Sequence, residues 1–161
     1  MRKLAILLVS FVLAAQTALA DDRLKLLGNW KLVSWEQEFQ DGSDRRPEYG
    51  KNPIGYLIFT AGGRMMAVLE GEGRKSPKSD EESLALFRSL VAYTGPYTIE
   101  GDKWVTRVDV AWHPDRRGTD QVRFFKVEGD RLFVTTTYRP NPNFGGKVAR
   151  SLLVWEREQA K

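Results

Sequence analysis

Three charged side chains could do chemistry in this chain of 161 residues: Glu36, Arg107 and Arg123. A carboxylate beside guanidinium groups can form an ion pair, and a buried carboxylate can accept a proton. An arginine without a partner can instead hold a ligand carboxylate through two parallel hydrogen bonds. We predict that the three side chains form a polar group inside, or at the mouth of, an otherwise apolar cavity.

The segments around these residues alternate with the two-residue period of a β-strand, and this period decides which way each side chain faces. If Trp30 and Leu32 point inward, Ser34 and Glu36 follow them on the same face. Side chains on the inner faces of other segments complete the candidate ligand-binding residues, which are Tyr56, Met65, Tyr97 and Trp155.

The opposite orientation stays open for the charged residues. In the segment 103–112, the face opposite Arg107 is much more hydrophobic and comprises Trp104, Thr106, Val108, Val110 and Trp112. If that face fills the interior, Arg107 lies in solvent. Glu36 and Arg123 fit either direction equally well.

Other reactive groupings do not occur in the sequence. His113 is the single histidine and there is no cysteine, so we expect no metal site and no cofactor. Catalysis by His113 would need Asp109 or Asp115 to orient its ring, and we expect a solvent-facing loop residue instead. The sequence also has neither the nucleophile motif of serine hydrolases nor the spacing of a phosphate-binding loop.

The first twenty residues have the three parts of a secretory signal peptide: a positive start, an apolar run over 4–15, and a small-residue site that ends at Ala20. The apolar run spans about 18 Å, too short for a bilayer core of about 30 Å. We predict a signal peptide over residues 1–20, cleavage after Ala20, and a single domain over residues 21–161. The mature protein would be periplasmic or secreted, without stable membrane insertion.

Charge limits the class of partner. The chain has 25 basic and 21 acidic side chains, and cleavage would remove two of the basic ones and none of the acidic ones. Such a balance argues against nucleic acid as a partner, because nucleic-acid binding needs a clustered basic face. The short basic pairs Arg45-Arg46 and Arg116-Arg117 are expected on solvated loops.

Turn-forming clusters divide the chain into strands and one helix. Ser79 and Glu82 fit a capping box at the start of the helix, apolar residues continue at helical spacing to Val91, and residues 94–96 end it. Eight strands are predicted near residues 29–39, 54–60, 64–70, 96–100, 103–112, 120–128, 131–138 and 148–157.

These elements favour an all-β fold, an eight-stranded antiparallel up-and-down barrel with the α-helix inserted between the third and fourth strands. A two-sheet sandwich is the competing layout. A barrel of eight strands has an interior that either fills with side chains or holds one small ligand.

Four stretches, "GNWKLVSWE", "YGKNPIGYLIFTAGGRMMA", "GTDQVRFFKVEGDRLFVTT" and "LVWERE", are similar in type and order to a known family. They resemble the lipocalin-like domain found in bacterial and fungal proteins, over most of residues 26–158. The resemblance implies a lipocalin-like closed barrel with an internal cavity, and it carries no agreed catalytic residues. Thr106 and Arg107 stand where many relatives have histidine, so any role of those histidines is not transferred.

The resemblance also implies a structural role for the first motif. In lipocalins, a Gly-x-Trp motif lies at the closed end of the barrel, and an arginine from a late strand packs over the indole. Gly28 and Trp30 match this motif, and Arg157 or Arg150 would supply the arginine as a cation–π contact worth about 0.5–2 kcal/mol. These residues are therefore expected at the barrel floor.

The expected function is binding of one small lipophilic or amphipathic molecule in the barrel cavity, with one or two arginines fixing its polar end. Two alternatives stay open. One is a barrel isomerase or cyclase with Glu36 as proton acceptor, and the other is a filled barrel that acts as a structural or partner-binding module. A cavity of at least about 300 Å³ would favour ligand binding over the filled barrel.

Overall fold

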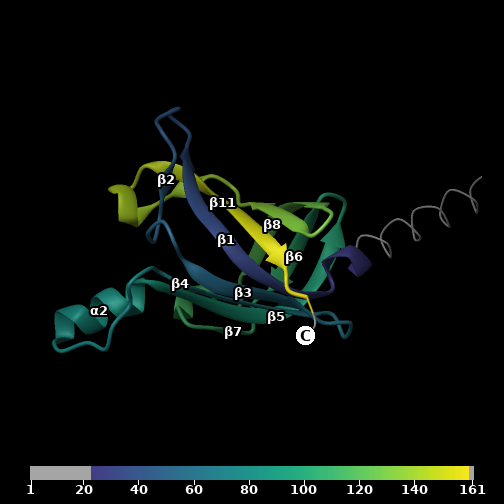
Figure 1. Ribbon diagram of the computed structural model, residues 1–161, viewed down its shortest axis with the longest axis horizontal. Helices are drawn as coiled ribbons and strands as arrows, with labels where there is room; N and C mark the ends of the chain where they lie inside the picture. The colour runs from purple at the N-terminus through teal and green to yellow at the C-terminus, as the bar shows by residue number, and fades with distance from the viewer. Residues whose placement is uncertain (1–22, 160–161) are drawn as a thin grey trace, which may run out of the picture.

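Eight long strands close into an antiparallel barrel in the computed structural model, which describes residues 23–159 (Figure 1). Each strand pairs with the next along the chain, and the last pairs with the first, so the predicted barrel is confirmed over the two-sheet sandwich. The strands are β1 (Gly28–Phe39), β3 (Ile54–Phe59), β4 (Arg64–Glu70), β5 (Leu90–Glu100), β6 (Lys103–Arg107), β8 (Asp120–Glu128), β9 (Arg131–Thr135) and β11 (Val148–Arg157).

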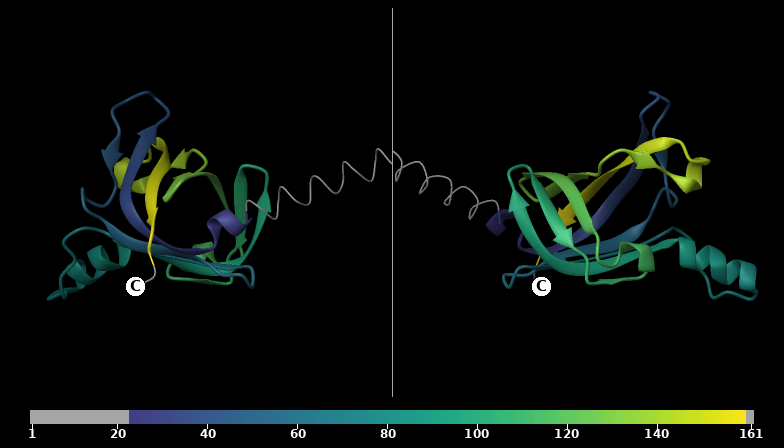
Figure 2. Two further views of the ribbon diagram at one scale, coloured as in Figure 1. Left: turned by 45° about the vertical axis from the view of Figure 1, so that its right-hand side comes forward. Right: turned by 180° about the vertical axis from the view of Figure 1, so that it is seen from behind.

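The two ends of the barrel differ. One end, here called the mouth, carries the long connections, and the other, the floor, carries the helical residues 23–26 and tight hairpin turns (Figures 1 and 2). The short elements of the mouth are β2 (Arg46–Pro47), α2 (Asp80–Arg88), β7 (Val110–Ala111), β10 (Arg139–Pro140), and the 3-10 turns η1 (Pro114–Arg116) and η2 (Pro142–Phe144).

Helix α2 lies between β4 and β5, the third and fourth barrel strands, as predicted. Ser79 caps it by accepting a hydrogen bond from the Glu82 amide at 3.2 Å. The helix ends at Arg88 rather than beyond Val91, because Val91 pairs with Leu69 in the β4–β5 ladder. None of its residues is buried, and it projects away from the barrel (Figure 1).

The described residues include no helix that is long and apolar enough to cross a bilayer. The expected signal peptide over residues 1–20 lies outside the described residues, and its cleavage after Ala20 stays a prediction.

A β-bulge in β1 changes the direction of its second half. Leu32 pairs with Trp155 and Ser34 pairs with Val154, so Val33 is an extra residue. The extra residue reverses the alternation from that point on. As a result Trp35, Gln37 and Phe39 are buried, and the predicted inward direction of Ser34 and Glu36 is wrong.

The predicted strand over residues 103–112 is interrupted after Arg107. The chain crosses closely over Gly95, where an added Cβ would lie 2.0 Å from the Arg107 carbonyl oxygen. Trp104, Thr106 and Val108 are buried, as the hydrophobic-face alternative required. Val110 and Trp112 do not follow them, since they lie past the break and are exposed.

The floor is packed around Trp30, which is fully buried and donates its indole N–H to the Leu26 carbonyl at 2.8 Å. The Arg157 guanidinium lies 4.1 Å from the indole centroid, the arrangement that the lipocalin resemblance implies. Arg157 also donates to the carbonyls of Lys25 and Leu27, each at 2.6 Å. Gly28 has a φ of 110°, a conformation that favours glycine, and approaches the Arg157 guanidinium closely.

Candidate functional site

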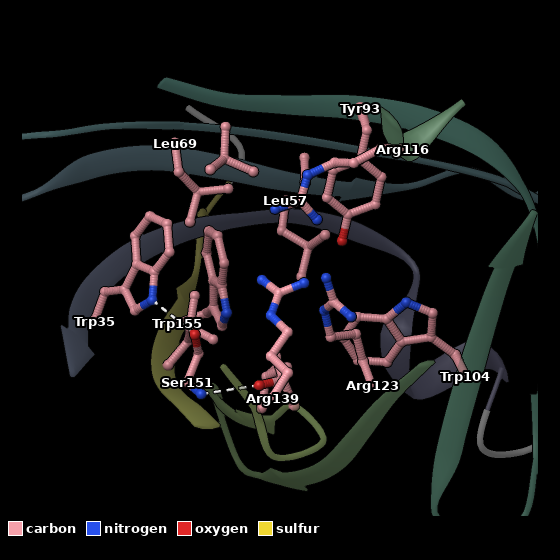
Figure 3. A pocket seen from close by; sticks show the side chains of 15 residues that line it. Trp35, Leu57, Leu69, Tyr93, Trp104, Arg116, Arg123, Arg139, Ser151 and Trp155 are labelled. Atoms are coloured by element: carbon pink, nitrogen blue, oxygen red, sulfur yellow. Dashed lines mark hydrogen bonds between the residues drawn. The ribbon is translucent and has the colours of Figure 1, made fainter. Parts of the chain in front are cut away.

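A cavity of about 50 Å³, here called the chamber, lies in the mouth half of the barrel (Figure 3). Its volume suits one or two water molecules. This volume is well below the value of about 300 Å³ that would favour a whole ligand enclosed in the barrel. Its apolar wall includes Trp35, Leu57, Leu69, Leu153 and Trp155.

Three arginine side chains converge on the chamber beside the Tyr93 hydroxyl (Figure 3). Arg116 and Arg123 each lie 5.8 Å from the centroid of the Tyr93 ring. Both donate to the same acceptor, the Gln121 side-chain oxygen, at 3.0 and 3.2 Å. Within residues 23–159, the Arg139 guanidinium makes no hydrogen bond and no ion pair. We call these three residues the arginine cluster.

The arginines come from three separate elements. Arg123 lies on β8, while Arg139 lies on β10 opposite Ala149 of β11. Arg116 ends the turn η1, which begins at Pro114. That turn is held by the Arg116 carbonyl, which accepts a hydrogen bond from the Thr119 hydroxyl at 2.7 Å. Two of the three guanidinium groups are thus placed by loop structure rather than by a long strand.

Mutual repulsion and burial act on the arginine cluster together. Burial lowers the pKa of Arg116, and the charges of Arg139 and Arg123 lower it further. Burial and then Arg123 lower the pKa of Arg139, while Glu48 opposes this shift. Arginine keeps its charge at neutral pH in spite of such shifts. The chamber therefore holds an excess of positive charge that a bound anion would offset.

Hydrogen-bond donors in the chamber outnumber acceptors. The indole N–H groups of Trp104 and Trp155 are buried, and neither has a partner among the described residues. The Ser151 hydroxyl already accepts from Trp35 at 3.1 Å and from Gln37 at 2.7 Å. Buried polar groups normally find partners. The unpaired donors therefore fit a group that only accepts, such as a carboxylate or a sulfonate.

Glu48 is the carboxylate whose charge interacts with those of Arg139 and Arg116. It accepts hydrogen bonds from the side-chain amides of Gln37, Asn141 at 3.2 Å and Asn143 at 3.0 Å. We call these three residues the amide cage. Burial raises the pKa of Glu48, and the two asparagine hydrogen bonds and the nearby arginines reduce that shift.

A larger hollow of about 550 Å³, here called the groove, lies outside the chamber at the mouth. Arg116, Arg139 and Val91 line both spaces, so they form the boundary between them. The apolar side chains that line the groove include Leu84, Phe87, Leu90, Pro140 and Pro142.

The segments around the groove are fastened to the barrel. Trp112 donates its indole N–H to the Phe87 carbonyl at 2.9 Å, and the two rings lie 5.2 Å apart. This contact ties the end of α2 to the segment after β7. Phe144 packs edge-on against Phe39 at 5.1 Å, so its ring anchors the loop 139–147 to β1.

The structure places four of the predicted ligand-binding residues inside the barrel. Arg123 and Trp155 line the chamber. Met65 and Tyr97 are buried in the core, where Tyr97 packs edge-on against Phe59 at 5.0 Å, and they do not line the chamber.

The other four lie on the outside of the barrel, which corrects the predicted site. Ser34 and Glu36 face outward because of the bulge, and Tyr56 is 42% exposed. Arg107 is exposed and pairs with Asp120 at 3.3 Å. The isomerase alternative loses its proton acceptor, since Glu36 does not reach the interior.

Sequence reasoning missed Arg116, Arg139, Glu48, Trp35 and Tyr93. The pair Arg116-Arg117 was expected on a solvated loop, yet Arg116 is half-buried and only Arg117 is exposed. A signal that could have drawn attention to Arg116 and Arg139 is that both lie in proline-containing segments at one barrel end. The inward direction of each side chain depends on tertiary contacts that this signal does not contain.

Two solved structures are distantly similar to this chain. Among solved structures, a redesigned β-barrel is similar at a TM-score of 0.42 and 12% identity, covering 85% of this chain and 95% of that one. Fatty-acid-binding protein 1 of Echinococcus granulosus is similar at a TM-score of 0.39 and 19% identity, covering 84% and 99%. No curated protein matches the chain in sequence.

The family comparison covers the whole barrel. Residues 27–158 match the family described as the lipocalin-like domain, from the residue before β1 to the residue after β11. Since the match extends over most of the chain, this protein belongs to the lipocalin-like domain family.

Proposed function

We propose that this protein binds one small amphipathic anion, with the acidic group of the ligand in the chamber and its apolar part in the groove. The observation that supports this function is the convergence of three guanidinium groups on one chamber without an ion-paired carboxylate among the described residues (Figure 3). An anion placed there would accept charge-assisted hydrogen bonds, each worth about 1.5–3 kcal/mol.

The volumes of the chamber and the groove support this placement of the acidic group and the apolar part of the ligand. The chamber of about 50 Å³ accommodates an acidic group but not a hydrocarbon tail. The groove of about 550 Å³ has apolar side chains from α2 and from the loop 139–147 along its walls. Arg116 and Arg139 stand between the two spaces, where the head group of such a ligand would join its tail.

Two fluorescent probes test this function. Anilinonaphthalene sulfonate carries an acidic group, and N-phenylnaphthylamine has a similar ring system without it. We expect the sulfonate probe to bind more tightly, and Arg139→Gln to weaken its binding about tenfold or more while leaving the neutral probe unaffected.

Arg107→Gln is the matched control, because it removes one positive charge from the outside of the barrel. Its affinity for both probes should equal that of the unmodified protein. Equal binding of the two probes, or equal losses in Arg139→Gln and Arg107→Gln, would contradict an anion site in the chamber.

The proposed place of action is outside the cytoplasm, on the strength of the signal-peptide pattern in residues 1–20. The intact mass of the protein purified from its host would show whether the chain begins after Ala20. A mass that includes residues 1–20 would contradict export by cleavage.

A further inference from the structure

Glu48 occupies an unusual position relative to the arginine cluster. It lines the groove together with Arg116 and Arg139, and its charge acts on both. In the described part of the chain, however, no ion pair joins Glu48 to an arginine. A carboxylate so close to guanidinium groups without a contact must be held in place by other groups.

The amide cage supplies these groups, and the cage is itself fixed. Gln37 is buried on β1 and also donates to the Ser151 hydroxyl at 2.7 Å. Asn141 caps η2, because its side-chain oxygen accepts a hydrogen bond from the backbone N–H of Asn143 at 3.0 Å. This cap leaves the nitrogen of the Asn141 side chain free to donate to Glu48.

Release from the cage would bring Glu48 toward the arginine cluster. The Arg139 guanidinium has no hydrogen-bond partner among residues 23–159, and oppositely charged groups in a partly buried site attract each other strongly. A carboxylate that reached Arg139 would use the donors that a ligand anion needs.

We infer that the amide cage holds Glu48 back as an internal competitor for the anion site, so that loss of the cage lowers anion affinity and loss of the Glu48 charge raises it. This inference rests on the proposed function. It assigns Gln37, Asn141 and Asn143 as positioning residues, which act on the acidic group of the ligand through Glu48.

The same arrangement makes anion binding depend on pH. The charged and titratable groups that face Glu48 are Arg139 from β10, Arg116 from η1 and the neighbouring Tyr49. The arginines stay charged over the range in which carboxyl groups titrate. Because burial raises the pKa of Glu48, acidification neutralises it before ordinary carboxyl groups, and repulsion of a bound anion falls.

The test measures the affinity of anilinonaphthalene sulfonate, whose sulfonate stays ionised across the range used. The cage variant is Asn141→Ser combined with Asn143→Ala, since serine keeps an oxygen for the η2 cap and removes the amide donor. We expect this variant to bind the probe about fivefold or more weakly at neutral pH. Adding Glu48→Gln should restore the affinity to that of the unmodified protein or above it.

Glu48→Gln alone provides the second measurement, and it does not depend on the cage variant folding. The unmodified protein should bind the probe more tightly as the pH falls through the raised pKa of Glu48, whereas Glu48→Gln should bind equally tightly across this range. Arg107→Gln should keep the pH profile of the unmodified protein.

Three outcomes would overturn the inference. One is a loss in the cage variant that Glu48→Gln does not rescue, because the cage would then be only structural. The second is weaker binding in Glu48→Gln, and the third is an unchanged pH profile. Failure of the proposed function itself looks different, since Arg139→Gln would then bind the probe as well as Arg107→Gln does.

Discussion

The two ends of this barrel use the same residue types in opposite ways. At the floor, Arg157 stacks on Trp30 at 4.1 Å and donates to two backbone carbonyls. At the mouth, Arg116 and Arg123 lie over Tyr93 at 5.8 Å and share one amide oxygen. The arginine at the floor has its hydrogen bonds supplied by the fold, and those at the mouth have donors to spare.

This difference separates an arginine that stabilises the fold from one that can bind a ligand. A satisfied, stacked guanidinium lowers the free energy of the folded state, whereas clustered guanidinium groups with unpaired donors raise it. The mouth should therefore be the less stable end, and substitutions there should change binding more than folding. The following predictions test this comparison, starting from the largest expected effect.

Trp30→Ala should have the largest effect on stability. The side chain is fully buried at the floor, and its removal leaves a large cavity and an unpaired Leu26 carbonyl. We expect a loss of about 3–5 kcal/mol in the free energy of unfolding, measured by urea denaturation. A loss below about 1 kcal/mol would show that the floor is not the packed end of the barrel.

Arg157→Gln and Arg139→Gln form a matched pair from the two ends. Arg157→Gln removes the cation–π contact and two hydrogen bonds, so we expect a loss of about 2–3 kcal/mol. Arg139→Gln should leave stability unchanged or slightly raised, since it relieves repulsion within the arginine cluster. Similar losses in the two variants would remove the distinction between the two ends.

Glu48 should give the smallest effect, visible as a pH dependence of stability. Burial raises its pKa in the folded state. Its contribution to stability is therefore fully present below the pKa of the unfolded chain, and it is lost as pH rises through the folded-state pKa. Urea denaturation across this range should show the unmodified protein losing stability relative to Glu48→Gln, and parallel curves would contradict the prediction.

The floor could be predicted from sequence because its determinants are local. The Gly28-x-Trp30 motif, the alternation of the first strand and the C-terminal strand with Arg157 all lie before the bulge or opposite it. The barrel itself followed from turn-forming residues between short alternating segments, and this signal does not require the direction of any single side chain.

The mouth could not be predicted because its geometry depends on interruptions. The extra Val33 reverses the direction of Glu36, and the break after Arg107 releases Val110 and Trp112 from the interior. A period-two pattern cannot show where one residue is left over. Arg116 and Arg139 enter from loops, whose side-chain directions are set by contacts distant in sequence.

The bulge at Val33 also indicates how relatives of this protein could acquire different ligands. Deletion of Val33 alone would restore regular alternation and leave Trp35 and Gln37 facing the interior, whereas deletion of both Val33 and Ser34 would turn Glu36 inward in their place, while Trp30 kept its position. A change in chain length, without any substitution, would replace aromatic and amide groups by an acid next to the arginines. Alignments of this strand across the family should therefore treat the two sides of Val33 as separate blocks, since gaps there carry information about specificity.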